Sequence, residues 1–356
     1  MTLKKITHWS IMGFALLISL ALFAGCASKA TSTSVKPTST VATAPKTTST
    51  PTPSPTATQT TAATTKTSSA PTPTPTTAPA TTQVAGYANP DLLVETLWLS
   101  QHLNDAGIRV VDVRTAAQYK AGHIQGAVSL PVEETFDQAN LAGGDLGTTA
   151  QLEKAFGDRG IASDTRVIIY DGGKETKAGR LFWTLEYAGH TKAAYLNGGL
   201  TKWQKENLPV STDETKATAA KFTANIKPAT LATKADVLAA IGKPGNAIVD
   251  TRSPAEYKGD DLRAKRGGHI PGAVNVDWTT QYISGDVPVL KSAAELKKMY
   301  EDLGVTRDKT IYVHCQSGQR SAVTYLVLRI MGYQNVRNYD GSWLEWGNDD
   351  TTPIEK

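Results

Sequence analysis

The part of the sequence best suited to chemistry is the stretch HCQSGQR at residues 314–320, which contains Cys315. The apolar run TIYV before it predicts a buried strand, and residues 320–333 predict a helix that ends at Gly332. A strand that ends at a cysteine just before a helix surrounds the sulfur with backbone N–H groups, which favour an anion and therefore a thiolate. Gly318 lets the backbone turn where a Cβ atom would clash. We therefore expect Cys315 to be a nucleophile, and not an inert buried thiol.

The spacing within this stretch separates two kinds of cysteine chemistry. Cysteine-dependent phosphatases resemble it, but they have one more residue between the cysteine and an arginine that binds phosphate together with the loop amides. Here the residues between Cys315 and Arg320 are Gln316, Ser317, Gly318 and Gln319. A persulfide needs a pocket for one extra sulfur atom, and not for a tetrahedral dianion. The shorter loop therefore favours sulfur chemistry over phosphate chemistry.

The sequence around Cys315 is the second copy of an internal repeat. The segments 110–131, 168–190 and 195–203 correspond in order to 248–278, 311–333 and 338–346. Both copies have an Asp-x-Arg motif, a tyrosine and a Gly-His-Ile turn, and the second copy carries the insertion DDLRAKR at 260–266 before that turn. Asp171 of the first copy occupies the position of Cys315. One fold has therefore been duplicated, and only one copy carries the thiol.

Short apolar runs alternate with helical stretches in each copy. In the second copy, residues 246–252 predict a strand, and two helices are predicted to follow the N-cap residues Thr233 and Ser292. Strands that alternate with helices imply a mainly parallel sheet covered by helices on both faces. We therefore expect an α/β protein with two tandem domains of this kind after a disordered N-terminal tether.

The ordered set of motifs resembles the tandem-domain rhodanese family of thiosulfate and 3-mercaptopyruvate sulfurtransferases over about residues 90–350. The resemblance implies a silent rhodanese-like domain at 87–212, with Asp171 in place of the cysteine, and a catalytic one at 226–352. It further implies that Cys315 takes sulfane sulfur from thiosulfate or 3-mercaptopyruvate as a persulfide. A thiophilic acceptor such as cyanide or a thiol then removes that sulfur. No cofactor and no metal are implied.

The residues around the cysteine do not decide the sulfur donor. The amides of residues 316–320 would stabilise a persulfide anion. Family members of the thiosulfate type tend to have basic residues after the cysteine, whereas those of the mercaptopyruvate type have a small neutral loop. CQSGQR matches neither pattern. Arg320 could bind the sulfonate end of thiosulfate or form a salt bridge within the domain. Glu256 stands where the family often has a substrate-binding arginine. Arg263 or Arg266 of the insertion could replace that arginine, or both could be exposed, solvated charges.

Two motif residues near the predicted loop complete the candidate site. Asp250 and Arg252 end a predicted strand, where they could contact substrate or form a structural ion pair. The Gly-His-Ile turns of both copies carry a histidine, His123 and His269, and this recurrence favours a structural hydrogen bond. Besides the catalytic Cys315, the candidate substrate-binding residues are Gln316, Ser317, Gly318, Gln319, Arg320, Arg266, Asp250 and Arg252.

The N-terminus has the features of a bacterial lipoprotein. The basic segment MTLKK precedes an apolar run at 11–24, which is too short to span a membrane and suits a signal peptide. The small residues Ala24 and Gly25 before Cys26 resemble a lipobox, which implies removal of residues 1–25 and a lipid on the Cys26 sulfur. An ordinary signal peptide is the alternative. We expect an exported protein that its lipid anchors to the bacterial cell membrane or envelope.

The remaining composition bounds the partners. Residues 26–86 are rich in Thr, Pro and Ser and predict a disordered linker, because no core can form there. The chain of 356 residues has a formal net charge of +4 with scattered Lys and Arg residues, so we expect no nucleic-acid partner. We expect a monomer whose partners are a small-molecule sulfur donor, a thiol or cyanide acceptor, and the membrane. A non-catalytic binding or sensing lipoprotein of the rhodanese type is the alternative.

Overall fold

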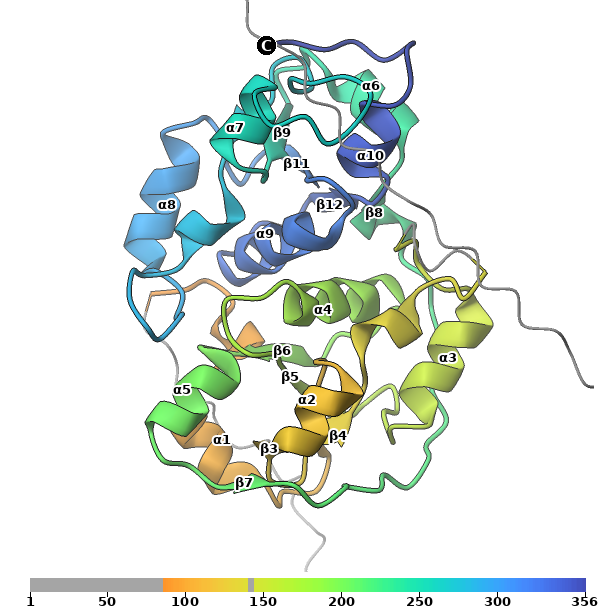
Figure 1. Cartoon of the computed structure of the whole chain (residues 1–356), viewed down its shortest axis with the longest axis vertical. Coiled ribbons are helices and arrows are strands. Elements are labelled where there is room, and N and C mark those ends of the chain that lie inside the picture. Colours follow the sequence, from red (N-terminus) through yellow and green to blue (C-terminus); the bar gives the residue numbers. More distant parts are fainter. Residues whose placement is uncertain (1–85, 140–143) are drawn as a thin grey trace, which may run out of the picture. The chain divides into compact units, whose positions relative to one another are not determined.

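A computed structural model describes residues 86–139 and 144–356, which contain two sheets of five parallel strands each (Figure 1). The first sheet has the order β1 (Leu93–Val94), β6 (Ala193–Leu196), β5 (Arg166–Tyr170), β2 (Ile108–Asp112) and β4 (Val128–Ser129). The second has the order β8 (Leu231–Ala232), β12 (Val336–Tyr339), β11 (Thr310–His314), β9 (Asn246–Asp250) and β10 (Val274–Asn275). Corresponding strands of the repeat occupy corresponding places, so the predicted duplication of one fold is confirmed. The predicted signal peptide and nearly all of the predicted linker lie outside the described residues.

Ten α-helices are present in the described residues. Those of the first domain are α1 (Thr96–His102), α2 (Ala116–Ala121), α3 (Thr149–Gly157), α4 (Lys177–Tyr187) and α5 (Gly199–Lys205). Those of the second are α6 (Lys234–Ala240), α7 (Pro254–Lys258), α8 (Ala293–Glu301), α9 (Gln319–Ile330) and α10 (Ser342–Trp346). The short strands β3 (His123–Ile124) and β7 (Val210–Ser211) form an antiparallel pair in the first domain.

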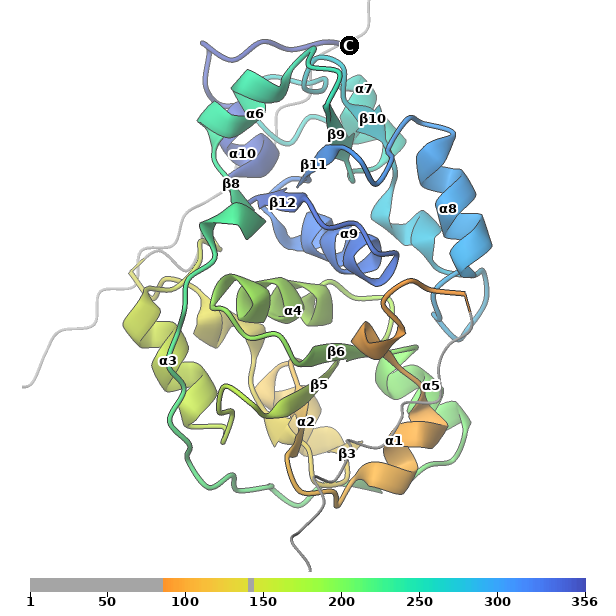
Figure 2. The same ribbon diagram turned by 180° about the vertical axis from the view of Figure 1, so that it is seen from behind.

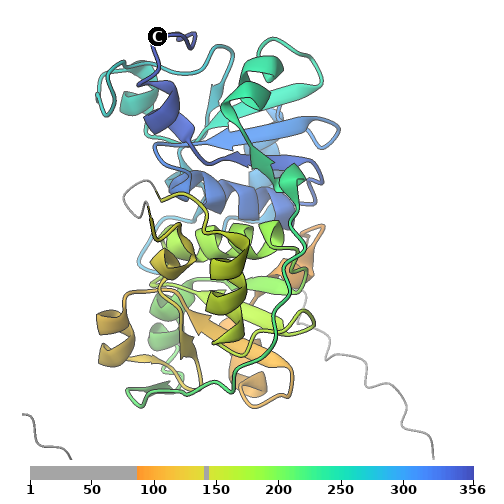
Figure 3. The same cartoon turned by 90° about the vertical axis from the view of Figure 1, so that its right-hand side faces the viewer.

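Helices cover both faces of the second sheet, as the alternation of side chains along its strands requires. Ile248 of β9 belongs to an apolar cluster with residues of α6 and α10, whereas its neighbour Val249 belongs to a cluster with residues of α8 and α9. Figure 3 shows helices on either side of the strands in both domains. The predicted fold, two tandem domains with mainly parallel sheets between helices, is confirmed.

The predicted helix starts in the second domain are also confirmed. Thr233 and Ser292 are N-cap residues, and each accepts a hydrogen bond from the backbone N–H three residues later. The side chains of Asp236 and Glu295 bond back to the cap, which completes a capping box at each helix. Local sequence therefore sets where α6 and α8 begin.

The two domains meet through α4 and α9, which lie side by side (Figure 1). A Cβ atom on Gly179 of α4 would lie 2.8 Å from the Cα atom of Val323 in α9, so the glycine permits a close approach of the two helices. Leu181 and Leu326 belong to one apolar cluster that contains residues of both domains. Because α9 begins four residues after Cys315, the first domain contacts the helix whose N-terminus lies next to the candidate nucleophile.

The segment after β7 returns along the first domain, past α3, before it enters the second domain (Figure 2). Phe222 of this segment packs edge-on against Phe156 of α3 with ring centroids 5.0 Å apart, and the Ala220 N–H donates to the Gly157 carbonyl. The connection between the domains is therefore fixed to the first domain by packing and by a hydrogen bond. Within the described ranges, none of the helices has the length and apolar character needed to cross a membrane.

Candidate active site

Cys315 directly follows β11, and α9 begins at Gln319, one residue before its predicted start. We call residues 315–320 the cysteine loop. Cys315 is only 1% exposed, whereas Gln316, Ser317 and Gln319 are partly exposed on the outer side of this loop. Gly318 leads into α9 in the left-handed conformation, with φ of +72°. The predicted arrangement of a strand, a glycine turn and a helix N-terminus around the thiol is confirmed.

A chain of polar groups connects the thiol to the loop backbone. The Ser321 Oγ atom lies 3.6 Å from the Cys315 Sγ atom and 2.6 Å from the Asn338 Oδ1 atom. The Nδ2 atom of Asn338 donates to the Gly318 carbonyl at 3.2 Å. A hydroxyl carries one proton, so Ser321 can accept from a neutral thiol while it donates to Asn338, or turn and donate to a thiolate. Ser321 can therefore serve both charge states of the sulfur.

Ser342 fixes the backbone of the cysteine loop at two points. Its Oγ atom accepts the N–H groups of Cys315 at 3.1 Å and Gly318 at 3.0 Å, and it donates to the Tyr339 carbonyl at 2.7 Å. Ser342 has φ of +49°, a region that disfavours side chains, and the corresponding residue of the first domain is Gly199 with φ of +54°. A strained serine only in the copy with the thiol indicates that its hydroxyl holds the loop.

One predicted donor to the sulfur has another partner. The N–H of Gly318 donates to Ser342, so the expectation that all amides of residues 316–320 serve the persulfide is corrected for this residue. The first N–H groups of α9, from Gln319 onward, have no intrahelical acceptors. These groups and the positive end of the helix dipole still favour a negatively charged sulfur at this position.

A buried carboxylate holds the guanidinium of Arg320. Arg320 donates to Glu256 through two hydrogen bonds of 2.7 and 2.8 Å, and Glu256 is 1% exposed. Burial alone would raise the pKa of the Glu256 carboxyl, but the hydrogen bonds and charge of Arg320 outweigh burial and lower that pKa to about 2. The predicted salt bridge of Arg320 within the domain is confirmed, and the pair carries no net charge at neutral pH.

The insertion contributes Arg263 to this site, and not Arg266. The Arg263 Nη1 atom lies 3.7 Å from the Glu256 Oε1 atom, and the Arg263 carbonyl accepts from the side chain of Gln316 at 2.9 Å. Arg266 donates to backbone carbonyls of Trp346 and Thr352 at 3.0 and 2.8 Å. The Arg266 guanidinium thus fixes the C-terminal segment, and the structure does not bring it to the cysteine loop.

Asp250 and Arg252 form a buried ion pair. Arg252 donates to Asp250 Oδ2 at 2.6 Å and to the Gly268 carbonyl at 2.7 Å. Arg114 donates to Asp112 in the first domain at the same distance of 2.6 Å, although that domain lacks the cysteine. The predicted structural ion pair is confirmed, and contact of Asp250 or Arg252 with a substrate stays a prediction.

The two histidines of the Gly-His-Ile turns also have equivalent surroundings. The Nδ1 atoms of His123 and His269 lie 2.8 and 3.0 Å from the carbonyls of Tyr119 and Tyr257. Each imidazole also stacks on the ring of that tyrosine, with centroids 3.7 Å apart in both domains. The predicted structural hydrogen bond is therefore confirmed in both copies.

His314, which precedes the cysteine, is neutral near pH 7. It is buried, and its Nε2 atom lies 3.7 Å from Asp250 Oδ2. Burial lowers the pKa of His314 to about 4, and the nearby charge of Asp250 offsets this only in part. His314 therefore supplies no positive charge to the thiolate.

In the corresponding loop of the first domain, the backbone N–H groups are bound by a side chain of the loop itself, that of Asp171. The carboxylate oxygens of Asp171 accept the N–H groups of Gly173 at 2.9 Å and Ala178 at 3.0 Å. Burial raises the pKa of Asp171 to about 7, although these two hydrogen bonds oppose the shift. A Cβ atom on Gly173 would lie 2.5 Å from the Cγ atom of Pro288, so the second domain also packs against this loop.

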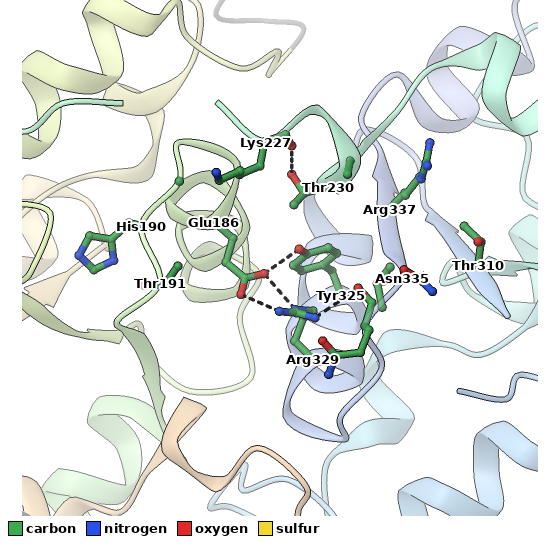
Figure 4. Close-up of a pocket in the computed structure, with 14 residues that line it drawn as sticks. Glu186, His190, Thr191, Lys227, Thr230, Thr310, Tyr325, Arg329, Asn335 and Arg337 are labelled. Carbon is green, nitrogen blue, oxygen red and sulfur yellow. Dashed lines mark hydrogen bonds and ion pairs between the residues drawn. The ribbon is translucent and has the colours of Figure 1, made fainter. Parts of the chain in front are cut away.

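A cavity of about 220 Å³ lies near the C-terminal ends of α4 and α9 (Figure 4). Glu186 of α4 points towards α9, where its carboxylate accepts from the Tyr325 hydroxyl at 2.6 Å and from Arg329 Nε at 3.1 Å. Thr310 at the start of β11 also lines the cavity, so the length of that strand, roughly 16 Å, separates the cavity from Cys315. This cavity is therefore distinct from the candidate active site.

Sequence analysis does not identify four residues that hold the cysteine loop, namely Ser321, Asn338, Ser342 and Arg180. Arg180, which belongs to the first domain, donates to the Gly318 carbonyl over a distance of 3.3 Å. A signal exists for Ser342, because the repeat has a glycine at the corresponding position. Ser321 lies next to the motif, whereas Asn338 and Arg180 reach the loop only through the tertiary fold.

Comparisons with known proteins show which proteins the two domains resemble. A family model for the rhodanese-like domain matches residues 95–206 and 233–349, each within a predicted domain. The chain is 36% identical over 269 residues to a thiosulfate sulfurtransferase of Azotobacter vinelandii, with 76% of this chain and 98% of the relative covered. It is also 36% identical over 285 residues to the sulfur carrier protein TtuD of Thermus thermophilus, with 76% of this chain and 99% of the relative covered. The solved structure of an anaerobic ergothioneine biosynthesis enzyme from Chlorobium limicola shares the fold. Its TM-score is 0.69 at 23% identity, with 76% of this chain and 71% of that chain covered.

Proposed function

The chain belongs to the rhodanese-like family, and we propose that it is a sulfurtransferase that moves sulfane sulfur through a persulfide on Cys315. The Cys315 thiolate attacks the outer sulfur of the donor thiosulfate. A disulfide bond to the cysteine forms as the bond to the sulfonate sulfur breaks, and sulfite leaves with the electron pair. Cyanide or a thiolate then attacks the outer sulfur of the persulfide, which returns the electron pair to Cys315 and releases thiocyanate or a new persulfide.

The observation that carries this proposal is the place of the Cys315 sulfur, at the N-terminus of α9 and 3.6 Å from the Ser321 hydroxyl. Thiolate and persulfide are both monoanions, and the helix terminus with its free N–H groups stabilises such a charge. Ser321 can donate to the sulfur whenever the sulfur is charged. The same environment therefore serves the enzyme before and after it accepts sulfur.

The contacts of Arg320 argue against a phosphatase. A phosphatase of this type needs the two Nη atoms of its arginine for the phosphate oxygens. In this protein both Nη atoms of Arg320 donate to Glu256. A phosphate dianion would have to displace a buried carboxylate that is charged at neutral pH. The site therefore suits the single negative charge of a thiolate or persulfide better than a phosphate dianion.

Thiosulfate is the donor that we propose first. Relatives from Azotobacter vinelandii and Pseudomonas aeruginosa, 36% and 34% identical to this chain, are thiosulfate sulfurtransferases. Arg263, whose side chain is 50% exposed, lies beside the Glu256–Arg320 pair; its carboxylate partner Asp261 is itself partly exposed, so an anionic donor can compete for this guanidinium. We place Arg263 in the proposed site instead of Arg266. 3-Mercaptopyruvate is the second donor to test.

We also propose that the protein is exported and anchored by a lipid on Cys26. This proposal rests on the lipobox-like sequence before Cys26, because residues 1–85 lie outside the described structure. Labelled fatty acid should be incorporated into the wild-type chain in a bacterial host and not into Cys26→Ala. Incorporation that persists in the variant would contradict the proposal.

Mass spectrometry of the intact protein tests the sulfurtransferase proposal. After incubation with thiosulfate, Cys315 should gain one sulfur atom, and cyanide should remove it with release of thiocyanate. Cys315→Ser should show neither event. The absence of an adduct with thiosulfate and with 3-mercaptopyruvate would overturn the proposal. Turnover of p-nitrophenyl phosphate that Cys315→Ser abolishes would favour a phosphatase instead.

A further inference from the structure

A buried arginine of the first domain reaches the cysteine loop of the second. Arg180 in α4 is 0% exposed, and its Nη1 atom donates to the Gly318 carbonyl at 3.3 Å. Its Nη2 atom donates to the Gly144 carbonyl at 2.7 Å and to Asp340 Oδ2 at 3.2 Å. The guanidinium also lies over the Trp183 ring, 4.5 Å from its centroid. Contacts on several sides therefore fix the guanidinium against the loop.

The second domain has no counterpart of this arginine. In the repeat, residue 180 corresponds to Val323 of α9, an apolar residue that packs against Gly179. The two domains share their sheet order, and α4 packs on α9. A charge that only supported the shared fold would be expected in both copies. The charge comes only from the first domain, which lacks the cysteine, and it contacts the cysteine loop of the second domain.

The atom that Arg180 contacts determines the direction of a peptide unit beside the thiol. The Gly318 carbonyl accepts from Arg180 Nη1 and from Asn338 Nδ2. In a trans peptide the next N–H points away from that carbonyl, so these two donors set the direction of the Gln319 N–H. Gln319 is the first residue of α9, and its N–H has no intrahelical acceptor. Anchoring the carbonyl therefore keeps one N–H donor of the helix terminus turned away from Arg180 and free of intrahelical bonds.

We infer that Arg180 is a positioning residue for Cys315, so that the domain without the cysteine takes part in catalysis. Arg180 holds the Gly318–Gln319 peptide in the orientation that favours a negative charge on the sulfur. The inference takes one point from the proposed function, namely that Cys315 is the nucleophile. Its test uses alkylation by iodoacetamide, which needs no sulfur donor. Failure of sulfur transfer would therefore be distinguishable from failure of this inference.

The experiment compares Arg180→Lys with a matched control in the full-length chain. Lysine keeps the charge but cannot donate to Gly318, Gly144 and Asp340 in the fixed geometry of a guanidinium. The control is Glu186→Gln, which weakens the ion pair between α4 and α9 that Glu186 forms with Arg329 at the far end of α4 (Figure 4). Thermal unfolding shows that each variant is folded, and peptide mapping assigns the alkylation to the intended cysteine.

We expect alkylation of Cys315 in Arg180→Lys to be about tenfold slower at neutral pH and to recover at alkaline pH, where the thiol ionises without help. Glu186→Gln should react as the wild type does, although both variants lose thermal stability. Equal rates in folded Arg180→Lys and the wild type would overturn the inference. An equal loss of rate in Glu186→Gln would also overturn it, because the effect would then come from domain contact alone.

A second variant keeps the inference testable if Arg180→Lys does not fold. Asp340→Asn weakens the ion pair between Arg180 and Asp340 and leaves Arg180 able to donate to the Gly318 carbonyl. We expect Asp340→Asn to unfold at a lower temperature and to keep the alkylation rate of Cys315 at neutral pH. A tenfold slower rate in Asp340→Asn would show that the ion pair, and not the contact with the loop carbonyl, controls the thiol, and would overturn the inference.

Discussion

The two Nη atoms of Arg320 face the two carboxylate oxygens of Glu256 in a parallel pair of hydrogen bonds, 2.7 and 2.8 Å long. Arg320 belongs to the cysteine loop, whereas Glu256 lies in α7 and is buried. The only arginine of the loop is thus neutralised from within the domain. An anionic donor is therefore attracted to the loop less strongly than the sequence CQSGQR suggests.

Glu256→Gln is expected to lower the KM for thiosulfate several-fold. Glutamine is nearly the same size, but it leaves the Arg320 charge uncompensated beside the sulfur, where it attracts a dianion. Steady-state kinetics with thiosulfate and cyanide measure the change. The control is Asp158→Asn, which removes an exposed carboxylate partner of Lys154 in the first domain and should change the KM little. A higher KM in Glu256→Gln would show that the carboxylate holds Arg320 in a binding position.

Substitution of Ser342 should separate backbone strain from hydroxyl binding. Ser342→Ala keeps a side chain at φ of +49°, whereas Ser342→Gly relieves the strain. The glycine variant should therefore be more stable than the alanine variant by about 1–2 kcal/mol. Both variants leave the N–H groups of Cys315 and Gly318 without the Oγ acceptor. Both should therefore transfer sulfur about tenfold more slowly or worse. Denaturant unfolding and turnover number are the measurements, and full activity in Ser342→Gly would refute the role of the hydroxyl.

His314 should make the protein sensitive to mild acid. Its pKa is about 4 in the folded chain against 6.5 in an unfolded one, so the unfolded state binds more protons between these values. Stability from this residue is present above pH 6.5 and is lost as the pH falls towards 4, by about 3 kcal/mol. His314→Leu should lose correspondingly less stability between pH 7 and pH 4.5 in urea unfolding. Equal losses in variant and wild type would contradict burial of a neutral imidazole.

Asp171→Cys should not create a second sulfur-transfer site. Five residues separate Asp171 from Lys177, which corresponds to Arg320 in the repeat, against four between Cys315 and Arg320. Pro288 packs against Gly173 of that loop. The double variant Asp171→Cys with Cys315→Ser should therefore gain no sulfur from thiosulfate, as Cys315→Ser alone does not. A persulfide at residue 171 by peptide mass would refute the one-site description.

The fold was predictable because its signals are local and occur twice. Capping residues such as Thr233 and Ser292, apolar runs such as TIYV and the repeated Asp-x-Arg motif all act within a few residues. The comparison of the two copies also separated structural from chemical residues. Asp250, Arg252 and His269 recur with the same contacts in the first domain, whereas Cys315 does not.

The electrostatics of the site were not predictable, because they depend on residues far apart in the sequence. Glu256 neutralises Arg320 from 64 residues away, and Arg180 reaches Gly318 from 138 residues away. Arg266 was expected near the cysteine loop, but carbonyls of the C-terminal segment bind its guanidinium. Charge and proximity in sequence did not distinguish Arg263 from Arg266; only the path of the insertion does.

The close packing of α4 on α9 also has a consequence for how the protein loses its structure. Leu181 and Leu326 share one apolar core, and the backbones meet at Gly179 with no room for a side chain. Melting of either domain would expose the apolar face of the other, so the two should denature together in a single cooperative transition. A fragment with only the second domain would present this uncovered face to water and should aggregate. By covering this face, the first domain should keep the half of the chain that carries the thiol in solution.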